Sequence, residues 1–420
     1  MPVTPRSRRL RRRGRIRFLL IALAVVVVAA GLGLLLRTDL EIDRGAQSYY
    51  TNDETSGAVV IAGVSRGGRG ALSWPGWGFD AAHHRRNPEA QQRPPFRTRW
   101  TSGFDSLIEF PPVVDERGMF VQTAKGRLFS ISLKNGKQLW NRRVTPPLAS
   151  SPTVDGQRVY TVSLGGESVT AFRRSDGRRV WRYAIGARSE SSPVLVDGVL
   201  YFGAEDGSLT ALTAATGKRE WRRDVGGAIK GSPAYSGGLL VVGSYDGHVS
   251  AWTAATGKRR WRTAGLGYLL SGGQFYSTPT IAYGRVYIGS TDHRVYSIVA
   301  STGRIAWTQG TGDWVYAGPA AVHGIILLGS YDGYFYAFDA RTGRRRWRFN
   351  AHARISGSAT VVADIVYFST FGNGTFGLDV KTGRQRWRRH QGRYSPVVAT
   401  RDDFFFVGYN TITSLMPRTR

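Results

Sequence analysis

Few residues of this 420-residue chain are placed to do chemistry. The chain has no Cys, which excludes a thiolate nucleophile, disulfides, Cys-based zinc sites, haem attachment and a lipid anchor on Cys. Its His residues are scattered, and the pair His83-His84 has no further ligand at metal-binding spacing. Asp402-Asp403 falls at an expected turn, and HExxH, GxxxxGKS/T and GxSxG signatures are absent. We therefore expect no catalytic, cofactor-binding or metal-binding residues.

A repeat fills most of the chain. The segment 192–221 recurs at 232–261 and again at 318–347. Eight Trp follow one another at spacings of 40, 41, 40, 40, 46, 40 and 40 residues. Self-similarity at one fixed period is the signature of a repeat architecture. These residues are Trp100, Trp140, Trp181, Trp221, Trp261, Trp307, Trp347 and Trp387.

Each repeat unit has the pattern of four short strands. Residues 199–203 and 209–212 are rich in β-branched, aromatic and other apolar residues that alternate along a strand. Asp206-Gly207 lies between them and suits a two-residue hairpin turn. Thr216-Gly217 marks a second turn before the strand that carries Trp221. Four short strands per unit are typical of a β-propeller blade.

The two ends of the repeat region complement each other. Residues 395–415 have the first strands of a unit but no Trp, whereas residues 96–103 have a Trp strand and nothing before it. Joining them completes an eighth blade and removes the exposed sheet edges of an open ring. The sequence therefore predicts an all-β fold, an eight-bladed β-propeller over residues 96–416.

The turn before each Trp resembles a known docking motif. The spacing Ala-x-Asp-x-x-Thr-Gly-x-x-x-Trp is similar to that of pyrroloquinoline-quinone-type propellers, and the stretch 77–80 resembles the lead-in of the same family. The resemblance implies that each Trp is structural: it stacks on the Gly turn of the next blade and donates its indole N–H to a carbonyl. The full match is Ala337, Asp339, Thr342, Gly343 and Trp347.

The family that the motif resembles contains both enzymes and binding proteins. Its quinoprotein dehydrogenases have long insertions between blades, a Ca²⁺ site, a catalytic Asp and often an adjacent Cys pair. Its BamB-type assembly factors are non-catalytic lipoproteins. Here the units are near-minimal and Cys is absent. We expect a non-catalytic scaffold that binds no cofactor. The alternative is a quinoprotein-like oxidoreductase whose active site is degenerate.

The central funnel of a propeller is its natural concave binding site. In each unit, the position three residues before the Pro of the innermost strand is expected at one mouth of that funnel. These positions combine acids, bases and Tyr, which suits either a binding ring or ordinary solvated loops. The candidates are Glu109, Glu190, Lys230, Tyr276, Tyr316 and Arg393.

One spacing is irregular. Eighteen residues separate Trp261 from Pro279, where other complete units have 12. The additional residues form an apolar, Gly-rich loop, which is typical of a contact surface or of a plug folded into the funnel. The candidates in this loop are Tyr268, Leu269, Leu270 and Phe275.

The amino end predicts a membrane anchor. Residues 1–17 carry eight Arg and no acid, and residues 18–36 carry no charge. As a helix the second segment is about 28 Å long, enough to span a bilayer. The Arg bias places the amino end in the cytoplasm and the rest outside. A cleaved signal peptide is the alternative. Residues 37–95 then form a stalk and lead-in segment, and residues 417–420 a tail.

The net charge of +29 predicts anionic partners. Many bases surround the Thr-Gly turns and the Trp strands, for example Lys258, Arg259 and Arg260, so they form a belt on the rim of the ring. Outside the cytoplasm such a belt attracts anionic lipid headgroups or envelope polymers, and not nucleic acid. A compositional bias toward Arg at solvated positions is the alternative. We expect a monomeric propeller in a bacterial plasma membrane that binds these polymers or envelope proteins.

Overall fold

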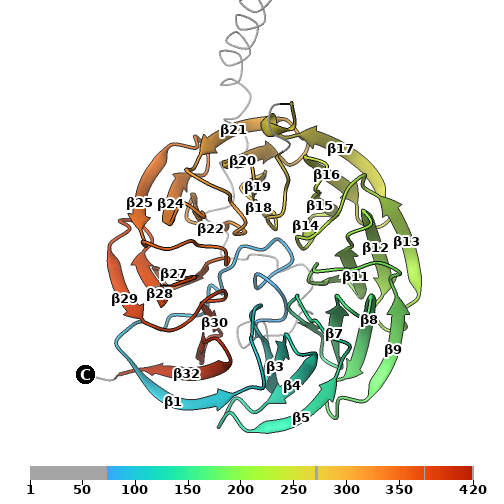
Figure 1. Ribbon diagram of the computed structural model, residues 1–420, viewed down its shortest axis with the longest axis vertical. Helices are drawn as coiled ribbons and strands as arrows, with labels where there is room; N and C mark the ends of the chain where they lie inside the picture. Colours follow the sequence, from blue (N-terminus) through green and yellow to red (C-terminus); the bar gives the residue numbers. More distant parts are fainter. Residues whose placement is uncertain (1–72, 270–272, 373, 419–420) are drawn as a thin grey trace, which may run out of the picture. The chain divides into compact units, whose positions relative to one another are not determined.

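The computed structural model describes residues 73–269, 273–372 and 374–418. Eight four-stranded antiparallel sheets surround a central axis (Figure 1). The prediction of an eight-bladed β-propeller is therefore confirmed. The expected cytoplasmic tail, transmembrane segment and most of the stalk lie outside the described residues. Within the described ranges, no helix is long and apolar enough to cross a membrane.

Seven blades are continuous in sequence, and their strands run in order from the innermost to the outermost. Blades 1 to 4 are β2 (Val113–Asp115), β3 (Gly118–Thr123), β4 (Arg127–Ile131) and β5 (Gln138–Arg143); β6 (Thr153–Val154), β7 (Arg158–Ser163), β8 (Ser168–Arg173) and β9 (Arg179–Ala184); β10 (Val194–Val196), β11 (Val199–Gly203), β12 (Ser208–Thr213) and β13 (Arg219–Asp224); β14 (Ala234–Ser236), β15 (Leu239–Gly243), β16 (His248–Thr253) and β17 (Lys258–Ala264). Blades 5 to 7 are β18 (Thr280–Ala282), β19 (Arg285–Gly289), β20 (Arg294–Val299) and β21 (Ile305–Gly310); β22 (Ala320–Val322), β23 (Ile325–Gly329), β24 (Tyr334–Asp339) and β25 (Arg345–Asn350); β26 (Thr360–Val362), β27 (Ile365–Thr370), β28 (Gly374–Asp379) and β29 (Gln385–Arg389).

The eighth blade closes the ring with both ends of the propeller. It contains β30 (Val397–Ala399), β31 (Phe404–Val407) and β32 (Thr411–Pro417), and its outermost strand is β1 (Phe96–Gly103). β1 and β32 pair in antiparallel fashion from Phe96 opposite Pro417 to Gly103 opposite Thr411. This is the pairing that the split repeat predicts.

The hydrophobic core lies between neighbouring blades. The second strand of a blade is almost wholly buried, as in β3, whereas the outermost strand has mainly exposed and half-buried residues, as in β25. Phe335 of blade 6 and Phe368 of blade 7 stack with ring centres 4.1 Å apart in one such layer. Each sheet is thus covered on both faces by its neighbours.

A Trp on the outermost strand joins each blade to the next. The Trp181 indole nitrogen donates to Ala214 O at 3.0 Å. Its ring lies against Gly217, where an added Cβ would come within 2.6 Å of the Trp181 ring and where φ is +72°. Space and backbone conformation therefore both require Gly. The same bond runs from Trp100 to Leu133, Trp140 to Arg174, Trp221 to Ala254, Trp261 to Ala300, Trp307 to Ala340 and Trp347 to Val380.

The joint to the closing blade is built differently. Trp387 packs against Phe96 and Phe406, with ring centres 6.2 Å from each. Among the described residues its indole nitrogen has no hydrogen-bond acceptor, because the eighth blade has no Thr-Gly turn at the equivalent place. Stacking of aromatic rings replaces the hydrogen bond there.

The lead-in segment, residues 73–95, is part of the packed body. It runs inside the ring (Figure 1) and makes main-chain hydrogen bonds to the innermost strands of six blades. Residues of this segment adopt left-handed conformations at Phe79, His83 and Arg85, which the surrounding bonds hold in place. The bonded pairs are Trp74 with Val114, Pro75 with Val154, Ala81 with Tyr235, Ala82 with Ile281, His84 with Ala321, Arg85 with Val361 and Ala90 with Ala363.

Two His side chains help to fix the lead-in segment. His83 is fully buried, and its Nδ1 lies 3.0 Å from Pro279 O. Burial, reinforced by the nearby Arg85 charge, lowers the pKa of His83 to about 3. His84 Nδ1 lies 2.6 Å from Oδ2 of Asp80. Burial opposes the charge of His84, but the Asp80 carboxylate outweighs this effect and raises the pKa of His84.

Candidate functional site

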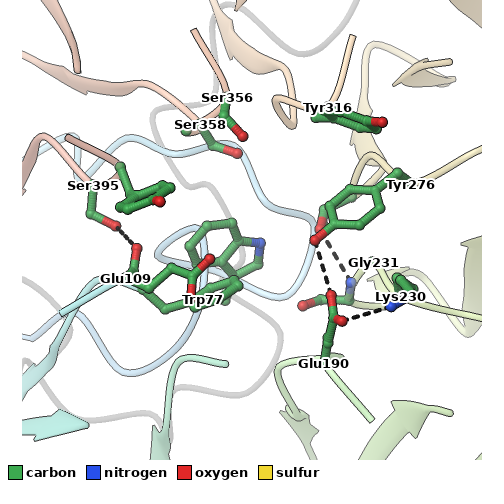
Figure 2. A pocket seen from close by; sticks show the side chains of 15 residues that line it. Trp77, Glu109, Glu190, Lys230, Gly231, Tyr276, Tyr316, Ser356, Ser358 and Ser395 are labelled. Carbon is green, nitrogen blue, oxygen red and sulfur yellow. Dashed lines mark hydrogen bonds and ion pairs between the residues drawn. The ribbon is translucent and has the colours of Figure 1, made fainter. Parts of the chain in front are cut away.

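The described residues form a pocket at one mouth of the funnel (Figure 2). The lead-in segment closes the channel beneath this pocket. The segment makes main-chain hydrogen bonds to Tyr235, Ile281 and Val361. In the sequence, each of these residues comes three positions after a residue that lines the pocket. Trp77 of the lead-in segment lines the pocket from below. The funnel mouth is therefore a blind pocket and not an open channel. Its volume is about 70 Å³, enough for a few water molecules or the tip of one side chain.

Five of the six predicted mouth residues come together in this pocket. Glu109, Glu190, Lys230, Tyr276 and Tyr316 line it, and each precedes an innermost strand. Arg393 does not line it: this residue is exposed and lies 5.6 Å from the ring centres of both Phe371 and Tyr394. The neighbouring Tyr394 lines the pocket in its place.

An ion-pair network joins three blades at one side of the pocket. Lys230 Nζ lies 2.6 Å from Oε1 of Glu190 and 2.8 Å from Oε1 of Glu205. The Tyr276 hydroxyl donates to the other oxygen of Glu190 at 2.9 Å. Burial disfavours the charge of Lys230, but its bonds to Glu190 and Glu205 outweigh this cost and raise the pKa of the ammonium. Both oxygens of Glu190 are thus occupied.

Glu109 faces the pocket from the opposite side (Figure 2). The Ser395 hydroxyl donates to its main-chain oxygen at 3.0 Å. Among the described residues, no cation lies within ion-pair distance of its carboxylate. Burial raises the pKa of the Glu109 carboxyl, and the negative charge of Glu190 adds to this effect.

Aromatic rings follow the funnel mouth from blade 4 to blade 8. Successive ring centres lie 6.2, 4.8, 4.8, 5.8 and 5.3 Å apart. Trp314 packs beside this arc and is 43% exposed. We call these rings the aromatic arc: Tyr245, Tyr276, Tyr316, Tyr331, Phe371 and Tyr394.

Four of the six residues of the aromatic arc were not among the predicted mouth residues: Tyr245, Tyr331, Phe371 and Tyr394. Tyr245 and Tyr331 immediately precede the Asp-Gly turns Asp246-Gly247 and Asp332-Gly333. Those turns connect the second and third strands of a blade, at the same end as the start of the innermost strand. The residue before each Asp-Gly is therefore a second ring of mouth positions that the sequence could have indicated.

The irregular loop packs on blade 5. Residues Leu266–Leu269 form one turn of 3₁₀ helix. Leu266 N donates to the Tyr296 hydroxyl at 2.8 Å, and Gly267 N donates to Oδ2 of Asp292 at 3.1 Å. Leu270 lies outside the described residues, and the placement of the Tyr268 and Leu269 side chains is not among the described features.

Phe275 is a core residue and does not belong to a contact surface. It is 1% exposed, and its ring packs against Tyr296 with centres 5.2 Å apart. An added Cβ on Gly243 would come within 2.6 Å of it, just as Gly329 meets Ile355. Phe275 therefore occupies the regular apolar position before each mouth residue, and the additional residues of the loop end before it.

The outermost strands carry basic side chains on the rim, as in β17 and β25. Part of this charge is neutralised within the blade. Nη2 of Arg262 lies 2.5 Å from Oδ2 of Asp246, and Nη2 of Arg346 lies 2.7 Å from Oδ2 of Asp339. Some of the rim arginines are therefore paired with acids of their own blade.

The pocket does not fit the quinone cofactor of quinoprotein dehydrogenases. A tricyclic ligand needs roughly 300 Å³ or more, whereas this pocket, which Trp77 lines, has about 70 Å³. A Ca²⁺ ion needs several free oxygen ligands, whereas both oxygens of Glu190 are bonded to Lys230 and Tyr276. In the described part of the chain, no three His, Asp or Glu residues lie close enough together to hold a metal.

The closed ring, the Trp-on-Gly joints and the funnel define an eight-bladed β-propeller of the pyrroloquinoline-quinone-type repeat class. The sequence matches the profile of the family described as outer membrane protein assembly factor BamB over residues 90–228, 205–313 and 266–417. The chain belongs to this family. BamB of Marinobacter adhaerens is 28% identical over 99 residues, which are 23% of this chain and 25% of that protein. This match thus spans a quarter of the relative's length.

Solved structures share the fold at low sequence identity. BamB from Moraxella catarrhalis is 15% identical, with a TM-score of 0.65, and the match covers 77% of this chain and 98% of that one. A europium-containing methanol dehydrogenase is 13% identical, with a TM-score of 0.69 over 80% and 88% of the two chains. A quinohemoprotein alcohol dehydrogenase from Comamonas testosteroni is 13% identical, with a TM-score of 0.66, and the match covers 83% of this chain and 81% of that one. At such identities the similarity establishes the fold alone.

Proposed function

We propose that this protein is a non-catalytic scaffold of the bacterial cell envelope that binds a protein partner at its funnel mouth. The observation that carries the proposal is the closure of the channel by the lead-in segment. It leaves a blind, aromatic-lined mouth beside the exposed ring of Trp314. Preformed surfaces with aromatic anchors are typical of protein–protein contacts. The relatives named as assembly factors support the same class of function.

The proposed anchor is the apolar segment 18–36, with the propeller outside the cytoplasm. A chain without Cys has no site for the lipid anchor of BamB-type lipoproteins. A membrane-spanning segment would hold the propeller near the plasma membrane by different means. The partner is therefore expected in or next to that membrane.

Photo-crosslinking from the funnel mouth tests the proposal. A photoreactive amino acid replaces Trp314, and in a matched variant it replaces Leu139, which is 57% exposed on the outermost strand β5. We expect a protease-sensitive adduct in intact cells from position 314 only. Equal adducts from both positions, or none from position 314, would contradict a partner at the funnel mouth.

The rim has a separate proposed role in binding anionic polymers or lipid headgroups. Residues 1–36 hold eight Arg and no acid, so the rest of the chain carries +21 of the net charge of +29. This charge, together with the exposed bases on strands such as β17, supports the role. Binding to vesicles with anionic lipids should weaken steeply as salt rises, because the attraction is electrostatic. Equal binding to neutral vesicles would remove this role.

A further inference from the structure

We infer that the funnel-mouth pocket takes the basic side chain, lysine or arginine, of the partner protein. This inference rests on the proposed function and names the chemistry of the partner. It begins from the charges that line the pocket: two carboxylates, Glu109 and Glu190, and one ammonium, Lys230. Lys230 and Tyr276 occupy Glu190, so one negative charge is left, on Glu109.

A half-buried carboxylate without a cation is costly to keep charged. Burial and the Glu190 charge both disfavour the ionised form of Glu109, which is consistent with its raised pKa. A cation entering the pocket would offset both effects. The carboxylate side chain of Glu109 projects over the pocket in Figure 2, so such a cation can reach it.

The walls of the pocket suit a cation for a second reason. Tyr276, Tyr316 and Tyr394 line it from three blades. Aromatic faces attract ammonium and guanidinium groups, most strongly where water is partly excluded. The protein makes such contacts at the same mouth, where Arg354 lies 5.7 Å from the Tyr331 ring centre. The pocket thus combines one carboxylate that has no cation with three Tyr rings in its walls, and both kinds of group attract a cation.

Trp77 contributes in a different way. Arg85 is 3% exposed and lies 4.6 Å from the Trp77 ring centre, so this ring already has a cation. The indole nitrogen of Trp77 is buried and has no hydrogen-bond partner within the described ranges. It can donate to a water that accompanies the bound cation.

Three small probes test the inference on the full-length protein in detergent. They are the Nα-acetyl N-methylamides of lysine, arginine and norleucine, of which norleucine keeps the carbonyls and loses the charge. We expect lysine and arginine to bind at least tenfold more tightly than norleucine by calorimetry or ligand-detected NMR. Equal affinities, or no binding of either basic probe, would overturn the inference.

Two matched variants assign the effect to Glu109. Glu109→Gln removes the charge at the pocket and should abolish the tenfold preference. Glu116→Gln makes the same change at an exposed turn of the same blade and should preserve it. Retention of the preference in Glu109→Gln would contradict the assignment. The crosslink from position 314 distinguishes the proposed scaffold function from the proposed binding of a basic side chain. If Glu109→Gln abolishes the probe preference but leaves the adduct undiminished, the partner binds at the funnel mouth without a basic side chain in the pocket.

Discussion

The Tyr276 hydroxyl donates a 2.9 Å hydrogen bond to Glu190, although the two residues precede blades 5 and 3. Lys230 of the intervening blade 4 binds the same carboxylate at 2.6 Å. One side of the funnel mouth is therefore fixed by bonds across three blades. A preorganised surface loses less conformational entropy on binding, which favours a scaffold that presents a rigid site.

Replacing Glu190 should weaken this network at a measurable cost. In Glu190→Gln, Lys230 keeps Glu205 but loses one mostly buried ion pair, so we expect a loss of about 1–2 kcal/mol in the free energy of unfolding. Urea denaturation measures it. Asp176→Asn is the control, because Asp176 pairs with Arg173 at an exposed turn and its midpoint should not change. Equal midpoints for Glu190→Gln and wild type would show that the network contributes nothing.

The Trp joints predict a graded response to Phe. Trp221→Phe keeps an aromatic ring but loses the 2.9 Å bond to Ala254 O, so the buried carbonyl is left without its donor. We expect a loss of about 1–3 kcal/mol. Trp387→Phe serves as the matched change at the joint that has no such bond, and its loss should be clearly smaller. Similar losses at both joints would assign the stability to ring size and not to the bond.

Burial of neutral His83 predicts acid sensitivity. Its pKa is about 3 in the folded protein, against an ordinary value of about 6.5 in an unfolded chain. Between these values the unfolded chain binds the additional proton. Stability is therefore lost as pH falls below about 6.5, by up to about 1.4 kcal/mol per pH unit. His83→Asn should flatten this slope in denaturation curves from pH 4 to 7, and an unchanged slope would exclude His83 as its source.

The pocket predicts no quinone chemistry. Incubation of the purified protein with pyrroloquinoline quinone and Ca²⁺ should leave no stoichiometric quinone absorbance after gel filtration. The physical reasons are the small volume above Trp77 and the engaged oxygens of Glu190. A bound cofactor at one equivalent would restore the oxidoreductase alternative.

The ring could be predicted from sequence because its determinants recur. Each Trp and each Thr-Gly turn appears at a fixed offset, so the number of blades follows from counting, and the missing Trp strand of the last unit identifies 96–103 as the closing strand. The mouth residues could be predicted for the same reason. Glu109, Glu190 and Lys230 precede their strands at one offset, and the ring symmetry brings them together.

Features outside the repeat could not be predicted in the same way. The lead-in segment bonds to the innermost strands of six blades through residues at irregular spacing, and three of its residues adopt left-handed conformations. These contacts do not recur at the period of the repeat, so the closure of the funnel and the position of Trp77 could not be predicted from the sequence. Phe275 was assigned to the contact loop for the opposite reason. It occupies a regular core position of the repeat, but the insertion just before it shifted its spacing from the preceding Trp.

The central claim is that the funnel mouth, and not the rim, holds the protein partner. The most direct test is the yield of the crosslinked adduct from position 314 in three backgrounds: wild type, Glu190→Gln with Tyr316→Phe, and Arg259→Gln with Arg260→Gln on the rim, each verified as folded by circular dichroism. We predict that the mouth variant loses at least nine-tenths of the adduct while the rim variant keeps it. Undiminished adduct in the mouth variant, or its loss in the rim variant, would contradict the account.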